Sequence, residues 1–244
     1  MKSYKPEMSF EEDTAAQYDA NSQRGDEEET VAFLEQWARG GPALELAIGT
    51  GRIALPLAAR GVQVDGIDFS PAMLARLRAK PGGSHLTIIE GNYADVAVTG
   101  NYRLTYIVFN TLFNLLTQDE QVRCFENVAA HLTEDGVFVV EGGVPAEFCN
   151  LRNNQYIDLE GLDVDNVRFD VARYNPVTQL LEETHVSLSS KGIKLNPIVT
   201  RFAWPAELDL MARIAGLRLL ERWASWGRAP VTPDSRNCIS VYGR

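Results

Sequence analysis

The sequence predicts a doubly wound α/β fold with a mostly parallel seven-stranded sheet and an antiparallel β insertion after the fifth strand. Short apolar runs alternate with helical patterns from residue 43 to residue 140. Such alternation is typical of a parallel sheet covered by helices on both faces. Strand-like alternation of side chains then fills residues 164–202, and two more strand patterns close the chain at residues 217–223 and 238–242.

The first 41 residues are expected to form a polar helical arm. Residues 1–30 contain nine acidic and three basic side chains and few aliphatic ones. A short helix is predicted at Ser9–Tyr18 and a second at Glu28–Trp37, which the glycine- and proline-containing turn at 39–42 ends.

Residues 42–142 contain the strands and helices of the main domain in alternation. Apolar runs predict strands at 43–47, 62–67, 87–90, 104–109 and 137–140. A helix follows the first strand as far as Arg60, and Ser70 before Pro71 begins another that runs to about Lys80. Thr117 and Glu120 form a capping box that opens a helix ending near Leu132.

The insertion spans residues 143–202, and the main domain resumes at 203–244. Its alternating patterns predict antiparallel strands at 164–174, 180–188 and 193–202. A helix at Pro205–Ala215 precedes the last two strands of the main sheet.

Composition limits the classes of partner. The 244 residues carry a formal net charge of −10, which disfavours nucleic-acid binding. The chain has no apolar run long enough to span a bilayer and no secretory signal pattern, so we expect no membrane partner. Its three cysteines lie far apart, which favours a cytoplasmic protein without a structural metal.

The glycine-rich turn after the first strand predicts a ligand-binding site. Gly49 and Gly51 open the following helix, where bare backbone can meet a ligand. Asp68 ends the next strand, where a carboxylate can accept hydrogen bonds from a ribose diol. Glu45 lies inside the first strand and no third glycine follows Gly51 at dinucleotide spacing. These residues predict an adenosine-containing cofactor and disfavour a bound pyrophosphate.

The stretch from Glu45 through Ala47 and Gly49 to Gly51 resembles the first motif of class I S-adenosylmethionine-dependent methyltransferases, with Ala47 in place of the first glycine. Residues 64–74 resemble the second motif and residues 90–95 the third, with Asn92 where an aspartate is usual. Residues 132–137 resemble the turn before the family's fifth strand, and residues 210–217 with the two strands after them resemble its antiparallel finish. The resemblance implies methyl transfer from S-adenosylmethionine to a small molecule.

The same resemblance implies cofactor contacts, position by position. The methionine part of the cofactor is expected to contact Glu45, Ala47, Gly49 and Gly51, and its carboxylate to contact Arg24 and Arg52. Asp68 is expected to bind the ribose, and the adenine is expected to contact Phe69, Met73, Asn92 and Tyr93. Phe109 and Asn110 are expected beside the sulfonium, and Tyr18 is expected to close over the cofactor. Simpler structural roles compete with some of these: Asp68 as a helix cap, Phe69 and Met73 as core, and Tyr18 and Arg52 as packing or solvated residues.

The acceptor is predicted to be a small molecule that the insertion recognises. The fourth strand is not followed by the Asp/Asn-Pro-Pro-Tyr pattern of nucleic-acid amine methyltransferases, and no cysteine follows a proline. An amine nitrogen is favoured over a hydroxyl because no histidine lies at the turns facing the methyl group, and hydroxyl acceptors generally need a base. Candidate catalytic residues are Tyr18, Asn110, Asn114 and His185.

Several alternatives stay open at this point. One is an O-methyltransferase in which His185 or Glu141 acts as base. A nicotinamide-dependent oxidoreductase and a non-catalytic methyltransferase-like subunit are less favoured. A homodimer through an exposed edge strand is also compatible with the sequence.

Overall fold

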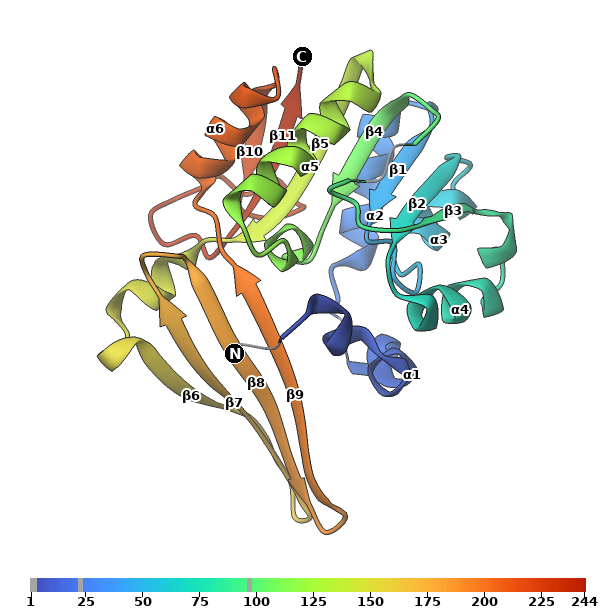
Figure 1. Cartoon of the computed structure of the whole chain (residues 1–244). Helices are drawn as coiled ribbons and strands as arrows, with labels where there is room; N and C mark the ends of the chain where they lie inside the picture. The colour runs from blue at the N-terminus through green and yellow to red at the C-terminus, as the bar shows by residue number, and fades with distance from the viewer. Residues whose placement is uncertain (1–3, 22–23, 96–97) are drawn as a thin grey trace.

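The structure is a computed structural model that describes residues 4–21, 24–95 and 98–244. It contains two sheets (Figure 1). Sheet A is built from β1 (Ala43–Leu46), β2 (Val64–Asp68), β3 (Thr87–Glu90), β4 (Tyr102–Ile107), β5 (Leu132–Gly143), β10 (Arg218–Trp223) and β11 (Asn237–Gly243). Sheet B is built from β6 (Gln155–Leu162), β7 (Asn166–Asn175), β8 (Leu180–Ser189) and β9 (Gly192–Arg201).

Sheet A confirms the predicted doubly wound architecture. Its strand order is β10-β11-β5-β4-β1-β2-β3, and β1 to β5 pair in parallel while β11 runs antiparallel to β5 and β10. Every residue of the central strands β1 and β4 is buried. A sheet covered on both faces buries its central strands completely, including polar side chains such as Glu45 and Arg103.

Two layers of helices cover sheet A. One face packs against α2 (Glu27–Ala38), α3 (Ala54–Ala59) and α4 (Pro71–Ala79), whose Leu34, Leu57 and Leu74 are fully buried. The other face packs against α5 (Gln118–His131) and α6 (Pro205–Ile214) through Phe125 and Met211. The capping box at the start of α5 is present as predicted.

Sheet B is antiparallel throughout, as predicted, with the order β6-β7-β8-β9. Its first strand, β6, was not expected from the sequence. A shift of register between Leu159 and Gly161 interrupts the strand, so its apolar alternation is too short to stand out. Figure 1 shows sheet B at the end of sheet A where the parallel strands finish.

The N-terminal arm joins the two sheets. It consists of a short 3-10 turn at Pro6–Phe10, then α1 (Glu12–Asn21) and α2; residues 1–3 and 22–23 of the predicted arm lie outside the described residues. The Ser9 hydroxyl donates to the Pro197 carbonyl of β9 at 2.7 Å, and the Ser70 hydroxyl donates to the Phe10 carbonyl at 2.8 Å. The arm therefore lies at the same end of sheet A as sheet B. Among the described helices, none has the length and apolarity needed to cross a membrane.

Candidate active site

The glycine turn after β1 is built from left-handed backbone. Ala47, Gly49 and Gly51 have φ angles of 56°, 55° and 77°. A side chain on Gly51 would place its Cβ 2.2 Å from Leu77 Cδ1, so this position needs glycine for space as well as for φ. Ala47 adopts the conformation that a glycine would take more easily, which is how the turn keeps its shape despite the departure from the motif.

Asp68 connects this turn to the start of α4. Its Oδ2 accepts the Gly49 N–H at 2.7 Å and its Oδ1 accepts the Ser70 N–H at 2.8 Å. Burial raises the pKa of Asp68 above its ordinary value, although these hydrogen bonds oppose the shift. The capping contact that competed with the ribose role is thus present, and it holds the carboxylate directly beside the glycine turn.

Glu45 is a buried carboxyl group beneath the turn. It is 4% exposed, and Tyr106 donates a hydrogen bond to its Oε2 at 3.0 Å. Burial raises the pKa of Glu45 to about 8. The positive charge of Arg52, which lines the same cavity, opposes this shift of the pKa. A buried carboxyl group at this place is suited to receive the amino group of a ligand.

The end of β4 forms a second strained turn. Phe109 and Asn110 have φ angles of 59° and 61°. The Phe109 N–H donates to Glu141 Oε2 at 2.8 Å, and Asn110 Oδ1 accepts the Gly143 N–H at 2.6 Å. Non-glycine residues in this conformation persist only where neighbours hold them, and here β5 does so.

Two arginines lie against the Phe109 ring. The Arg24 and Arg52 guanidinium carbons are 4.6 Å and 3.8 Å from its centroid. Arg24 also pairs with Glu141 at 2.7 Å, and Asn237 donates to the same Glu141 oxygen at 2.9 Å. Both carboxylate oxygens of Glu141, which is 1% exposed, are therefore occupied by donors. Glu141 is a poor candidate for the base that the sequence left open.

Helix α1 closes over the glycine turn. Thr50 Oγ1 donates to Asp19 Oδ1 at 2.5 Å, and Lys80 Nζ contacts Asp19 Oδ2 at 2.6 Å and the Thr50 carbonyl at 2.8 Å. Burial raises the pKa of the neighbouring Tyr18, which lines the cavity beneath. Thr50 and Asp19 were not predicted as site residues, although Thr50 stands between the two glycines.

A small cavity of about 30 Å³ lies between these turns. It brings together several residues predicted from the sequence. Its lining consists of Tyr18, Glu45, Ala47, Ile48, Gly49, Thr50, Arg52, Ile53, Val108, Phe109 and Thr111. Ile48, Ile53, Val108 and Thr111 were not predicted as site residues. Val108 and Thr111 follow β4 and reach the glycine turn only through the fold.

The residues predicted to meet adenine lie around α4 and after β3. Phe69 is half-buried with its ring 6.0 Å from that of Phe10, and Met73 is buried beside Gly49. Asn92 uses its side-chain oxygen to accept the Ala94 N–H at 2.9 Å. The fourth of these residues, Tyr93, belongs to the core.

Tyr93 is 1% exposed and donates its hydroxyl to the Thr111 carbonyl at 2.8 Å. Its ring therefore supports the turn after β4 from within, and its hydroxyl is already used. Asn114, a catalytic candidate, is half-buried in the same 3-10 turn as Thr111.

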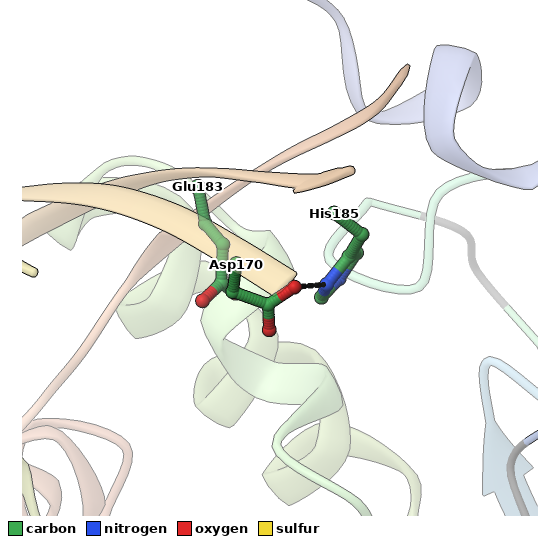
Figure 2. A group of neighbouring side chains, drawn as sticks. All are labelled: Asp170, Glu183 and His185. Atoms are coloured by element: carbon green, nitrogen blue, oxygen red, sulfur yellow. Dashed lines mark hydrogen bonds and ion pairs between the residues drawn. The ribbon is translucent and has the colours of Figure 1, made fainter. Parts of the chain in front are cut away.

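His185 lies on sheet B, apart from the residues that line this cavity. Its Nδ1 is 2.7 Å from Asp170 Oδ1, and Glu183 lies beside the pair (Figure 2). Tyr156 donates a hydrogen bond to Glu183 at 2.5 Å. The fold thus groups Tyr18 with the glycine turn and places the one predicted histidine in a separate polar cluster.

Comparison with known proteins matches this arrangement to one family. Residues 43–136 match the family model described as a methyltransferase domain. The chain is 36% identical to the CcbJ methyltransferase from Streptomyces caelestis, covering 98% of this chain and 99% of that one with a TM-score of 0.90. It is 27% identical to the cypemycin N-terminal methyltransferase of a Streptomyces species over 84% of each chain.

A third similarity concerns a structure with its cofactor. The fold matches S-adenosylmethionine-bound CalS10, an amino pentose methyltransferase from Micromonospora echinaspora, with a TM-score of 0.69 at 18% identity over 94% of this chain and 95% of that one. The buried carboxyl of Glu45 and the glycine turn beside it have the chemistry that suits the amino acid end of such a cofactor. The chain therefore belongs to the class I S-adenosylmethionine-dependent methyltransferases and uses S-adenosylmethionine as its methyl donor.

Proposed function

We propose that this enzyme transfers the methyl group of S-adenosylmethionine to an amine nitrogen of a small molecule. The names of two similar proteins support an amine acceptor, since one methylates the N-terminus of cypemycin and the other is an amino pentose methyltransferase. Sheet B, which follows β5, is proposed to form the acceptor side of the site.

The observation that carries the proposal is the absence of a free base around the described cavity. No histidine lines it. Glu45 is buried and bonded to Tyr106, and Glu141 is bonded to three donors including Arg24. A hydroxyl acceptor generally needs a positioned base, whereas a neutral amine carries its own lone pair.

The chain's own residues would bind, orient and exclude water. Glu45 would hold the cofactor's amino group, and Arg52 together with Arg24 its carboxylate. Asp68 would accept hydrogen bonds from the ribose, with Phe69 and Met73 against the adenine.

At the reacting centre, Tyr18, Phe109 and Asn110 would position the sulfonium and the acceptor amine relative to each other. Phe109 and Asn110 would lie beside the sulfonium, with Tyr18 and Asn110 orienting the amine. The methyl group moves in line from sulfur to nitrogen, so positioning at near-attack distance in a water-poor pocket supplies most of the catalysis.

One observation favours a second candidate, O-methylation. The Nδ1 contact between His185 and Asp170 is the arrangement that orients an imidazole as a general base. That imidazole does not line the described cavity, so we rank this candidate below N-methylation.

Product analysis separates the two. The purified enzyme would be incubated with ¹³C-methyl S-adenosylmethionine and matched panels of small amines and small phenols or alcohols, and the ¹³C shift of the product would identify the methylated atom. We expect N-methyl products, a rate that rises with pH until the amine is neutral, and most activity retained in His185→Ala. Turnover of hydroxyl acceptors alone, lost in His185→Ala, would replace N- by O-methylation.

A further inference from the structure

Sheet B has two faces of different chemistry. Side chains alternate between the faces along a strand, and directly paired residues share a face. One face holds the polar residues Asp170, Glu183 and His185. On the opposite face, over the half of the sheet that lies farthest from sheet A (Figure 1), the side chains are almost all aliphatic or aromatic. We call this surface the apolar face; it is formed by Ile157, Leu159 and Leu162, the alternate residues of β7 from Val167 to Val171 and of β8 from Thr184 to Leu188, and Ile193, Leu195 and Pro197.

The apolar face is open to solvent. Nearer to sheet A, the same side of sheet B is buried within the chain. Val199 there is 6% exposed, and the buried Arg201 donates hydrogen bonds to Gln121 and Glu207. This burial ends where the apolar face begins. The most exposed residues of the apolar face are 59–73% exposed, and they are Ile157, Leu159, Leu162, Ile193 and Leu195.

The exposed area of this face is large for a monomer. Val171 and Leu188 add to it, with 40% and 37% of their surface exposed. At ~150–200 Å² for a fully exposed aliphatic residue, the exposed residues together present on the order of 700 Å² of mainly apolar surface. The largest apolar patch on a typical monomer is ~300–600 Å². A standard interface buries ~800 Å² on each partner, so the apolar face has the size that one side of a stable dimer needs.

A second copy of the same sheet is the occupant that fits this face. The apolar faces of two antiparallel sheets pack ~10 Å apart, with their strands within about 30° of each other. In a two-fold dimer the same patch meets itself. None of the side chains on the apolar face, all of which the structure describes, is charged, so no like charges would meet there. The chain's net charge of −10 opposes close approach of two copies elsewhere and disfavours an anionic lipid surface.

We propose that the protein is a homodimer in which the apolar faces of two sheets B pack on each other about a two-fold axis. The leucine and isoleucine side chains of the two sheets interdigitate and form a core that both chains share. This inference goes beyond the proposed function and does not depend on which atom is methylated. It also differs from pairing through an edge strand, which would join β6 or β9 of two chains and leave the apolar face exposed.

Sedimentation velocity over about 1–100 µM protein tests the dimer. The chain has a mass of 27.1 kDa, and we expect a species of twice that mass to predominate at the upper end of the range. Leu159→Glu and Ile193→Glu, made separately, should each raise the dimer Kd at least hundredfold. The two-fold axis brings each new carboxylate into the interface twice, where it would be buried without a partner.

Two matched controls introduce the same charge elsewhere. Ile214→Glu changes an isoleucine of α6 that is 62% exposed, and Ser187→Glu changes the polar face of sheet B. Both should leave the dimer Kd within threefold of the parent value. Leu159 and Ile193 are exposed in the single chain, so their variants should bind S-adenosylhomocysteine with an affinity within twofold of the parent, which shows that they are folded.

A second measurement uses the parent chain and needs no substitution. Protein labelled at isoleucine methyl groups would be mixed with protein labelled at leucine and valine methyl groups, and nuclear Overhauser effects between chains would be recorded. We expect contacts from the methyl groups of Ile157 and Ile193 to leucine or valine methyl groups of the partner.

A parent chain that stays monomeric at about 100 µM would overturn the proposal. So would a dimer that both glutamate variants leave intact, or contacts between chains that arise only from other surfaces. Flotation of the monomer with phosphatidylcholine vesicles, lost in Leu159→Glu, would assign the apolar face to a lipid surface instead. The proposed function fails separately, through absence of N-methyl product.

Discussion

The protonation state of Glu45, beneath the glycine turn, is expected to change when the cofactor binds. Burial raises its pKa from 4.5 to about 8, so the free enzyme holds it neutral at pH 7. A folded-state pKa above the unfolded value means that Glu45 favours the fold at low pH, and this contribution is lost as the pH rises through 8. A cofactor amino group beside Glu45 would favour the ionised carboxylate and reverse the shift.

We therefore expect S-adenosylhomocysteine binding at pH 7 to release close to one proton and to tighten as the pH rises from 6 to 8. Calorimetry in two buffers of different ionisation enthalpy measures that release. Glu45→Gln should bind without releasing the proton. Glu90→Gln, at the exposed end of β3, is the control. Equal proton release in Glu45→Gln and the parent would show that Glu45 does not meet the amino group.

Asp68 tests whether a capping residue is also a ligand. Asp68→Ala should weaken S-adenosylhomocysteine binding about 10- to 150-fold, because each charge-assisted hydrogen bond is worth about 1.5–3 kcal/mol. Asp65→Ala is a control on the same strand, since Asp65 bonds to Tyr102 and belongs to the opposite face. Affinity near the parent value in Asp68→Ala, with a lowered Tm, would leave Asp68 a structural cap.

At the scale of elements, α1 controls entry to the glycine turn. A cavity of about 30 Å³ is far below the ~300 Å³ or more of a ligand pocket, so the elements around it must separate for the cofactor to enter. Burial alone would raise the pKa of Asp19, but hydrogen bonds from Lys80 and Thr50 outweigh it and lower the pKa. The Asp19 contacts therefore hold α1 closed at neutral pH and are lost as the pH falls through that lowered value.

Asp19→Asn should accelerate dissociation of S-adenosylhomocysteine about threefold to tenfold, since it removes the ion pair with Lys80 and weakens the Thr50 contact. Stopped-flow displacement measures the rate. Glu12→Gln removes a different contact of the same helix, the exposed pair with Arg76, and should have little effect. Identical rates in all three proteins would mean that α1 does not gate the cofactor.

The elements that the sequence predicted well are those whose pattern is local. The central strands β1 and β4 were predictable because each is a short, mostly apolar run that is buried along its whole length. Strand β6 was not, because its bulge breaks the alternation. Helix α1 begins at Glu12 rather than Ser9: Ser9 belongs to the preceding 3-10 turn, and its hydroxyl donates to the Pro197 carbonyl, 188 residues away.

Within the site too, contacts set by local sequence were predictable and contacts between distant segments were not. The Gly49–Asp68 contact spans one strand-helix-strand unit and follows from the motif. The Arg24–Glu141 pair and the placement of Tyr93 in the core depend on how distant segments pack. Motif spacing carries no information on such contacts, so they could not be predicted from the sequence.

At the scale of the whole molecule, the cofactor residues come from several elements of one sheet and from the arm. Tyr18 belongs to α1, Glu45 to β1 and Asp68 to β2, and Phe109 follows β4. A ligand bound among these elements connects them in the folded state and has no comparable site in the unfolded chain. Its binding free energy therefore adds to the stability of the whole molecule.

S-adenosylhomocysteine at a hundredfold excess over its Kd should stabilise the enzyme by about 2.7 kcal/mol. For a chain of this length, that corresponds to a rise in Tm of about 5–11 °C. NADH should give no rise, because the turn after β1 has no third glycine for a pyrophosphate and has Glu45 beneath it. Differential scanning calorimetry across a concentration series of each ligand makes the measurement, and Asp68→Ala should need a proportionally higher concentration for the same shift. A Tm that rises with NADH and not with S-adenosylhomocysteine would contradict the assignment of the glycine turn.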